Sequence, residues 1–119
     1  MHLNYSKGLH LLATIFCESE LLLIDGAKYI NFLNQQIDEL ELNRLHHYVH
    51  QFENGGYTGV ICLTESHIAF HTWPEFGLLT LDIYLSNYQK DNSEKCRNLL
   101  KVSQEYFLSN KVEIKDVFR

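Results

Sequence analysis

Apolar residues recur along this chain with two different periods, which separate predicted strands from predicted helices. Residues 8–16 form an apolar run that favours a strand. Between residues 25 and 42, apolar residues recur at spacings of three and four among Asn, Gln, Asp and Glu. The recurring residues are Ile30, Leu33, Ile37 and Leu40. This spacing puts them on one face of a helix, so a strand followed by an amphipathic helix is predicted here.

The middle of the chain predicts four further strands. Residues 43–52 alternate between two faces, and the glycines of residues 53–56 predict a turn because glycine adopts positive φ at little cost. Pro74 cannot donate to a β-ladder, so a second turn is expected around it. The three remaining strand-like runs are residues 58–64, 67–72 and 77–85.

A second helix and a last strand complete the pattern. Asn92 or Ser93 is expected to cap a helix that runs to about Leu108. Its inner face would carry Cys96, Leu99, Leu100, Ser103 and Phe107. Residues 111–118 then alternate as a strand.

The order β-α-β-β-β-β-α-β predicts an α+β fold, a two-layer α/β sandwich. Short turns between strands favour an antiparallel sheet, with two helices on one of its faces. Alternate positions such as Val60 and Ile61 leave apolar side chains on both faces of that sheet. An apolar face without helices favours a partner sheet, so a homodimer that meets through its sheets is expected.

Composition narrows the class of protein. The 119 residues, 45% apolar and 21% charged, fit a single globular domain over residues 1–119. A net charge of −5 without a basic cluster argues against nucleic-acid binding. Cys17, Cys62 and Cys96 are too widely spaced for a metal knuckle or a disulfide framework. No secretory signal or membrane-spanning run is recognisable, so a cytoplasmic protein is expected.

Chemically active side chains are concentrated in residues 65–75, Glu-Ser-His-Ile-Ala-Phe-His-Thr-Trp-Pro-Glu. A half-buried strand has no structural need for so many polar groups. His67 and His71 suggest a metal site, but four residues along a strand span about 13 Å, too far for one ion. The histidines of residues 46–50 fail for the same reason, and no metal is expected.

The string Glu65-Ser66-His67-x-x-x-His71-Thr72-Trp73-Pro74-Glu75-x-Gly77, followed by Asp82, resembles the prokaryotic S-adenosylmethionine decarboxylase proenzymes. The likeness extends through Gly8, His10, Phe52 and Gly59. It implies autocatalytic cleavage between Glu65 and Ser66 into residues 1–65 and 66–119. It further implies a pyruvoyl group made from Ser66, which serves polyamine synthesis without an external cofactor. Such a carbonyl forms a Schiff base with the substrate amine and takes up the electrons released with carbon dioxide.

The resemblance also implies roles for other residues. His71 corresponds to the processing base, and Thr58 stands where the family usually carries a processing serine. Phe52 corresponds to the aromatic residue that stacks on adenine, and Glu75 to the carboxylate that binds the ribose. Because Ser66 and His71 are five residues apart, they point to opposite faces of one flat strand. The family's composite dimer sites imply that they meet across an interface.

One departure from the family pattern leaves alternatives open. Ser86 stands where the family usually has the cysteine that protonates the decarboxylated intermediate, and an alkanol is a much weaker acid than a thiol. Decarboxylation of S-adenosylmethionine is the leading hypothesis. A pyruvoyl decarboxylase for arginine or ornithine is an alternative, and a catalytically inactive homologue with a regulatory binding role is another.

Overall fold

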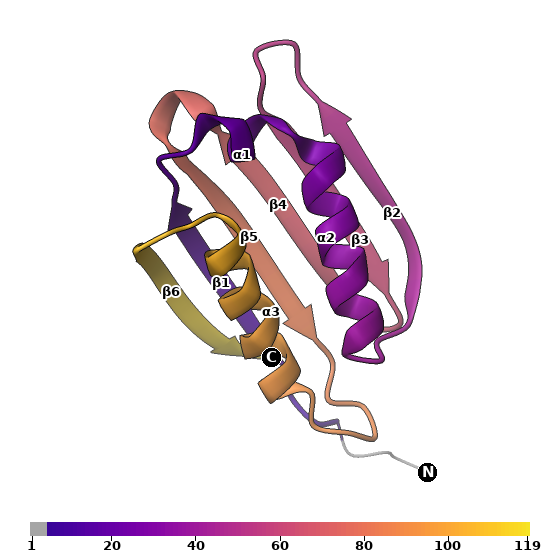
Figure 1. Cartoon of the computed structure of the whole chain (residues 1–119). Coiled ribbons are helices and arrows are strands. Elements are labelled where there is room, and N and C mark those ends of the chain that lie inside the picture. Colours follow the sequence, from indigo (N-terminus) through magenta and orange to yellow (C-terminus); the bar gives the residue numbers. More distant parts are fainter. Residues whose placement is uncertain (1–4) are drawn as a thin grey trace.

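The structure, a computed structural model, describes residues 5–119 and contains one six-stranded sheet with helices on one face (Figure 1). The spatial order of strands is β2-β3-β4-β5-β1-β6, and all neighbours are antiparallel. The strands are β1 (Leu9–Phe16), β2 (Arg44–Gln51), β3 (Tyr57–Leu63), β4 (Ser66–Trp73), β5 (Leu78–Leu85) and β6 (Lys111–Phe118). The predicted α+β fold with an antiparallel sheet is confirmed.

Two main helices, α2 (Gly26–Glu39) and α3 (Ser93–Tyr106), cover one face of the sheet. Helix α2 packs over β2 and β3, whereas α3 packs over β1 and β5. The helix predicted over residues 25–42 begins as expected, after its Asp25 cap, but it ends at Glu39, and the short helix α1 (Glu20–Ile24) that precedes it was not predicted. The Asp25 carboxylate accepts a hydrogen bond from the Lys28 amide at 3.1 Å and so caps α2 as a separate helix.

The turn predicted around Pro74 is a short 3-10 helix, η1 (Pro74–Phe76). Pro74 occupies its first turn, where no amide donor is needed. Gly77 follows with a φ of +65°, a left-handed conformation that costs glycine little. Trp73, predicted to lie in the turn, is instead the last residue of β4.

The core lies between the sheet and the helices. Every second residue of β1 is buried there, namely Leu9, Leu11, Ala13 and Ile15. Tyr29 of α2 is fully buried, and its ring centroid lies 4.9 Å from that of Phe70 and 4.7 Å from that of Phe107. These edge-on and tilted aromatic contacts join α2 to β4 and to the end of α3.

The other face of the sheet, called the open face below, carries no helix. Its side chains include Tyr48, Val60 and Trp73, which are 59%, 37% and 43% exposed. It also carries five histidines: His10, His46, His50, His67 and His71. Within the described residues, no helix is long and apolar enough to cross a membrane.

The buried hydroxyl pair between α2 and α3 provides a test of the helical layer. The Tyr29 hydroxyl lies 2.9 Å from Ser103 Oγ, and both residues are fully buried. We expect Ser103→Ala to lower the free energy of unfolding by about 1–3 kcal/mol, because the phenol loses its partner. Urea denaturation measures this change. Adding Tyr29→Phe should recover part of the loss, and a double variant that is no more stable than Ser103→Ala would contradict this account.

Candidate active site

The predicted site residues form two groups at opposite ends of β4. Glu65, Ser66 and Ser86 lie where β4 begins and β5 ends. The second group, formed by Phe52, Thr58, His71 and Glu75, lines a separate cavity near the other end of β4. We call these groups the cleavage end and the histidine end.

At the cleavage end, the predicted scissile bond lies in a tight hairpin. Leu63 and Ser66 are paired across β3 and β4, so Thr64 and Glu65 alone form the turn. Glu65 has a φ of +61°. This left-handed conformation costs a non-glycine residue roughly 1–2 kcal/mol. The peptide bond before Ser66 therefore follows a strained residue.

The Ser66 hydroxyl is held by the backbone of the neighbouring strand. The Ser86 amide donates a hydrogen bond to Ser66 Oγ at 2.9 Å. The Ser86 carbonyl accepts a 2.8 Å bond from the Asn92 side chain, and Ser86 Oγ accepts a 3.1 Å bond from the Tyr88 amide. Ser66 is thus oriented by a main-chain donor that is itself fixed on both sides.

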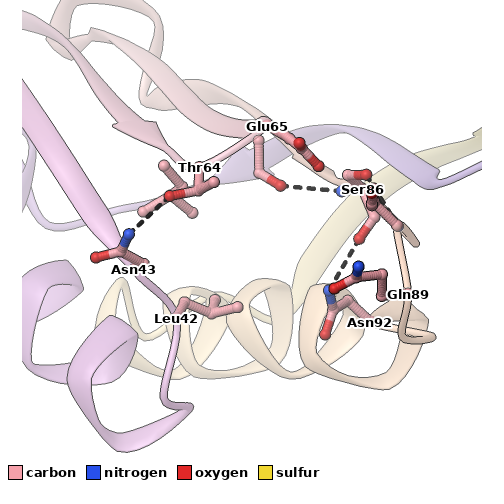
Figure 2. Close-up of a pocket in the computed structure, with 10 residues that line it drawn as sticks. Leu42, Asn43, Thr64, Glu65, Ser86, Gln89 and Asn92 are labelled. Atoms are coloured by element: carbon pink, nitrogen blue, oxygen red, sulfur yellow. Dashed lines mark hydrogen bonds between the residues drawn. The ribbon is translucent and has the colours of Figure 1, made fainter.

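A cavity of about 360 Å³ opens beside this hydroxyl (Figure 2). The Asn43 amide group donates to Thr64 Oγ1 at 2.7 Å on one side of the cavity, and Asn92 bonds Ser86 on the other. Asn92 Oδ1 is buried without a hydrogen-bond partner. Glu65 and Ser86 also line an adjacent cavity of about 600 Å³, which reaches Tyr84 on the open face. The cleavage end therefore communicates with the open face.

At the histidine end, Thr58 and His71 face each other directly across β3 and β4. Thr58 Oγ1 contacts His71 Nδ1 and donates to the Phe70 carbonyl at 3.2 Å. The cavity here measures about 480 Å³. Two half-exposed aromatic rings line it, Phe52 and Trp73, together with the Glu75 side chain. Flat rings beside a carboxylate suit a planar ligand that also carries hydroxyl groups.

The two ends do not meet within one chain. Ser66 lies on the same side of β4 as the buried residues Ile68 and Phe70, whereas His71 lies on the open face. Five residues along a strand also span about 17 Å. The predicted opposition of Ser66 and His71 is therefore present in the structure. An arrangement that joins them has to bring in a second chain.

The open face near the cleavage end carries a cluster of rings. His10 lies with its ring centroid 5.9 Å from that of His67 and 5.7 Å from that of Tyr84. Burial lowers the pKa of His10, although the nearby Asp82 carboxylate opposes this shift. His10 Nε2 is buried and has no hydrogen-bond partner in the structure. His10 therefore presents an imidazole nitrogen without a hydrogen-bond partner on this face.

Cys62 is exposed on the open face between His46 and His67 of the adjacent strands. Among residues 5–119, no group of three or more His, Cys, Asp and Glu side chains is arranged to hold a metal ion. Burial raises the pKa of the Cys96 thiol to about 12, which makes this residue a packing group rather than a nucleophile.

Sequence reasoning missed several residues that line the cleavage-end cavity: Leu42, Asn43, Tyr88, Gln89 and Asn92. Asn92 was expected only to cap α3, yet its side chain bonds the Ser86 carbonyl. Trp73 was assigned to a turn, but it lines the histidine-end cavity with Phe52. The strands predicted over residues 58–64 and 67–72 left residues 65 and 66 as the turn. The turn lies instead at Thr64 and Glu65, so the predicted bounds did not give the Thr58–His71 pairing.

Comparison with known proteins shows which sequences and folds this chain resembles. The Picrophilus torridus S-adenosylmethionine decarboxylase proenzyme is 34% identical over 82 residues, 69% of this chain and 63% of that relative. The Persephonella marina proenzyme is 35% identical over 106 residues, 88% of this chain and 79% of that relative. The chain thus spans less than two thirds of the Picrophilus relative, and 59% of the Thermoplasma acidophilum proenzyme.

The crystal structure of the Aquifex aeolicus adenosylmethionine decarboxylase superposes with a TM-score of 0.84 at 26% identity. The match covers 98% of this chain and 92% of the Aquifex chain. The S-adenosylmethionine decarboxylase family model matches residues 9–119. Since that match includes all six strands and both ends of the site, this chain belongs to the S-adenosylmethionine decarboxylase family.

Proposed function

We propose that the chain is a proenzyme that cleaves itself between Glu65 and Ser66 and then decarboxylates S-adenosylmethionine. The observation that carries this proposal is the Ser66 hydroxyl, held by the Ser86 amide at 2.9 Å beside a strained Glu65. Cleavage here yields residues 1–65 and 66–119. The product, decarboxylated S-adenosylmethionine, is an aminopropyl donor for polyamine synthesis.

Maturation begins when Ser66 Oγ attacks the Glu65 carbonyl carbon. The peptide C–N bond breaks, the hydroxyl proton passes to the nitrogen of residue 66, and an ester forms. A base then removes the α-proton of residue 66, its Cβ–O bond breaks, and the Glu65 carboxylate leaves. Water hydrolyses the remaining enamine through its imine form, which releases ammonia and gives the pyruvoyl group. The attack is intramolecular, because the Ser66 hydroxyl and the Glu65 carbonyl belong to adjacent residues.

The residues around Ser66 fit a pyruvoyl group because the adjoining cavity of about 360 Å³ gives substrate access to this position. The group supplies an electron sink when carbon dioxide leaves. Because Ser66 Oγ leaves with the Glu65 carboxylate, the Ser86 amide bond orients residue 66 only before cleavage. The Ser86 hydroxyl accepts a hydrogen bond from the Tyr88 amide at 3.1 Å, which leaves the hydroxyl proton available for donation. Position 86 is where the catalytic acid is expected.

At the histidine end, His71 acts as the base that removes the α-proton during maturation, assisted by Thr58. Phe52 stacks on the adenine ring and Glu75 accepts hydrogen bonds from the ribose hydroxyls. The shared cavity of about 480 Å³ supports these assignments, because it places the ring and the carboxylate within reach of one nucleoside.

The working unit is a homodimer with composite sites. Apolar side chains on the open face, including Tyr48 and Val60, favour packing against a second sheet about 10 Å away. A two-fold axis that lies between the open faces and runs across β4 would bring the cleavage end of one copy over the histidine end of the other. The cavity that joins Glu65 to Tyr84 provides the path from the cleavage end to that interface.

Intact-mass measurement of the purified protein tests maturation. We expect two fragments, residues 1–65 and 66–119, with the second carrying a pyruvoyl group that an amine and a reductant can trap. Ser66→Ala should remain one chain. Carbon dioxide release is then measured with S-adenosylmethionine, arginine and ornithine in parallel. Release from arginine or ornithine alone would contradict the proposed substrate, and a persistently intact wild-type chain would indicate an inactive homologue.

Complementation tests the composite site. Ser66→Ala and His71→Ala should each fail to mature when expressed alone. Coexpressed, half of their random dimers are mixed, and each mixed dimer has one complete site, so about a quarter of wild-type activity is expected. Differently tagged copies allow the mixed dimer to be isolated by tandem purification. A mixed dimer without cleaved chains would show that Ser66 and His71 do not cooperate between copies.

A further inference from the structure

The Thr58 hydroxyl has two partners but only one hydrogen to donate. It lies 3.2 Å from the Phe70 carbonyl oxygen, which can only accept, and it also contacts His71 Nδ1. If its hydrogen goes to Phe70, the second contact is a hydrogen bond only when His71 Nδ1 carries a proton. If its hydrogen goes to Nδ1, the Phe70 contact is lost. Two bonds are made in the first arrangement and one in the second.

We propose that Thr58 is a positioning residue that acts through His71 by fixing its imidazole as the Nδ1–H tautomer, with Nε2 left to accept the proton. This inference rests on the proposed function for the chemistry that Nε2 performs. The Thr58 hydroxyl itself is not required to touch the scissile bond. In the maturation step, the α-proton of residue 66 in the second copy passes to Nε2 as the Cβ–O bond breaks.

The surroundings hold Thr58 in this geometry. Its β-branched side chain has restricted χ1 freedom in a strand, so its hydroxyl direction is better defined than that of serine. The Phe70 carbonyl is anchored because the Phe70 ring is fully buried, with ring centroids 4.9 Å from Tyr29 and 5.9 Å from Tyr57. The threonine is therefore suited to fixing a tautomer.

The other polar groups near His71 do not form a hydrogen bond with its ring in the described residues, so Thr58 is the residue that can fix the tautomer. Thr80 of β5 is its register partner on the other side, and His50 of β2 lies beyond Thr58. Further titratable groups on the same face are His67 on β4 and Asp82 on β5, whereas Glu75 of η1 lines the same cavity. Within the described part of the chain, Thr58 is the hydrogen-bond partner found for the His71 ring.

The test reads the tautomer directly by NMR of ¹⁵N-histidine-labelled protein. A Ser66→Ala background keeps the chain whole, and loss of signals in His71→Gln assigns the ring. In the neutral ring we expect a protonated Nδ1 and an unprotonated Nε2. Thr58→Val, which preserves shape, should move the proton toward Nε2, and Thr58→Ser should retain the Nδ1–H form. Thr80→Val is the matched control, because it removes a hydroxyl from the residue that pairs with His71 on β5. It should leave the tautomer of the His71 ring unchanged.

In the Ser66-containing chain, Thr58→Val should slow self-cleavage by roughly tenfold or more across the pH profile, while Thr58→Ser and Thr80→Val stay near wild type. A His71 ring protonated at Nε2 in the Ser66→Ala chain would overturn the inference. So would Thr58→Val protein that cleaves slowly but keeps the Nδ1–H form. Because the NMR measurement needs no cleavage, a wild-type chain that never matures would refute the proposed function without deciding the tautomer.

Discussion

The alternation of side chains along β4 is the constraint on which the rest of the site depends. One strand carries both Ser66 and His71, and their odd separation puts them on opposite faces and near opposite ends. No rotamer change within a folded chain can bring the two side chains together. The separation of the cavities at the two ends follows from the same geometry. A chain built in this way keeps the two groups of candidate site residues apart, with an exposed sheet face between them.

The contact that orients Ser66 comes from the main chain, and this changes the meaning of the departure at position 86. The Ser86 amide holds the hydroxyl, while Asn92 and the Tyr88 amide fix the residue from two sides. A different side chain at this position therefore leaves the orienting bond intact. Under the proposed function, loss of the family's usual cysteine would bear on proton donation during turnover, not on the geometry of the Ser66 hydroxyl.

The order of elements along the chain, the helix faces and the opposition of Ser66 and His71 could be predicted, because they follow from periods of two and 3.6 and from short turns. The place of β1 between β5 and β6 was not predicted. The Thr58–His71 pair was not predicted, because the expected strand ends left residues 65 and 66 as the turn, whereas the turn at Thr64 and Glu65 shifts every pairing in the hairpin. Asn43 and Asn92 could not be identified. Their places in the cavity depend on how loops return to the end of β4, and local sequence patterns contain no such information. Helix α1 was missed because five residues are too few to show a periodic pattern.

Strand order has a mechanical consequence for a chain cut at the β3–β4 turn. The first piece would contain β1, β2 and β3, and the second would contain β4, β5 and β6. In the sheet, however, β1 lies between β5 and β6. Three of the five pairs of neighbouring strands, β3–β4, β5–β1 and β1–β6, would then join different polypeptides. The strands of the two pieces would alternate in the sheet. The pieces could therefore separate only if β1 lost its backbone hydrogen bonds to both β5 and β6. Cleavage of the backbone at this hairpin therefore creates two new chain ends, while the hydrogen bonds of the sheet keep the two pieces together.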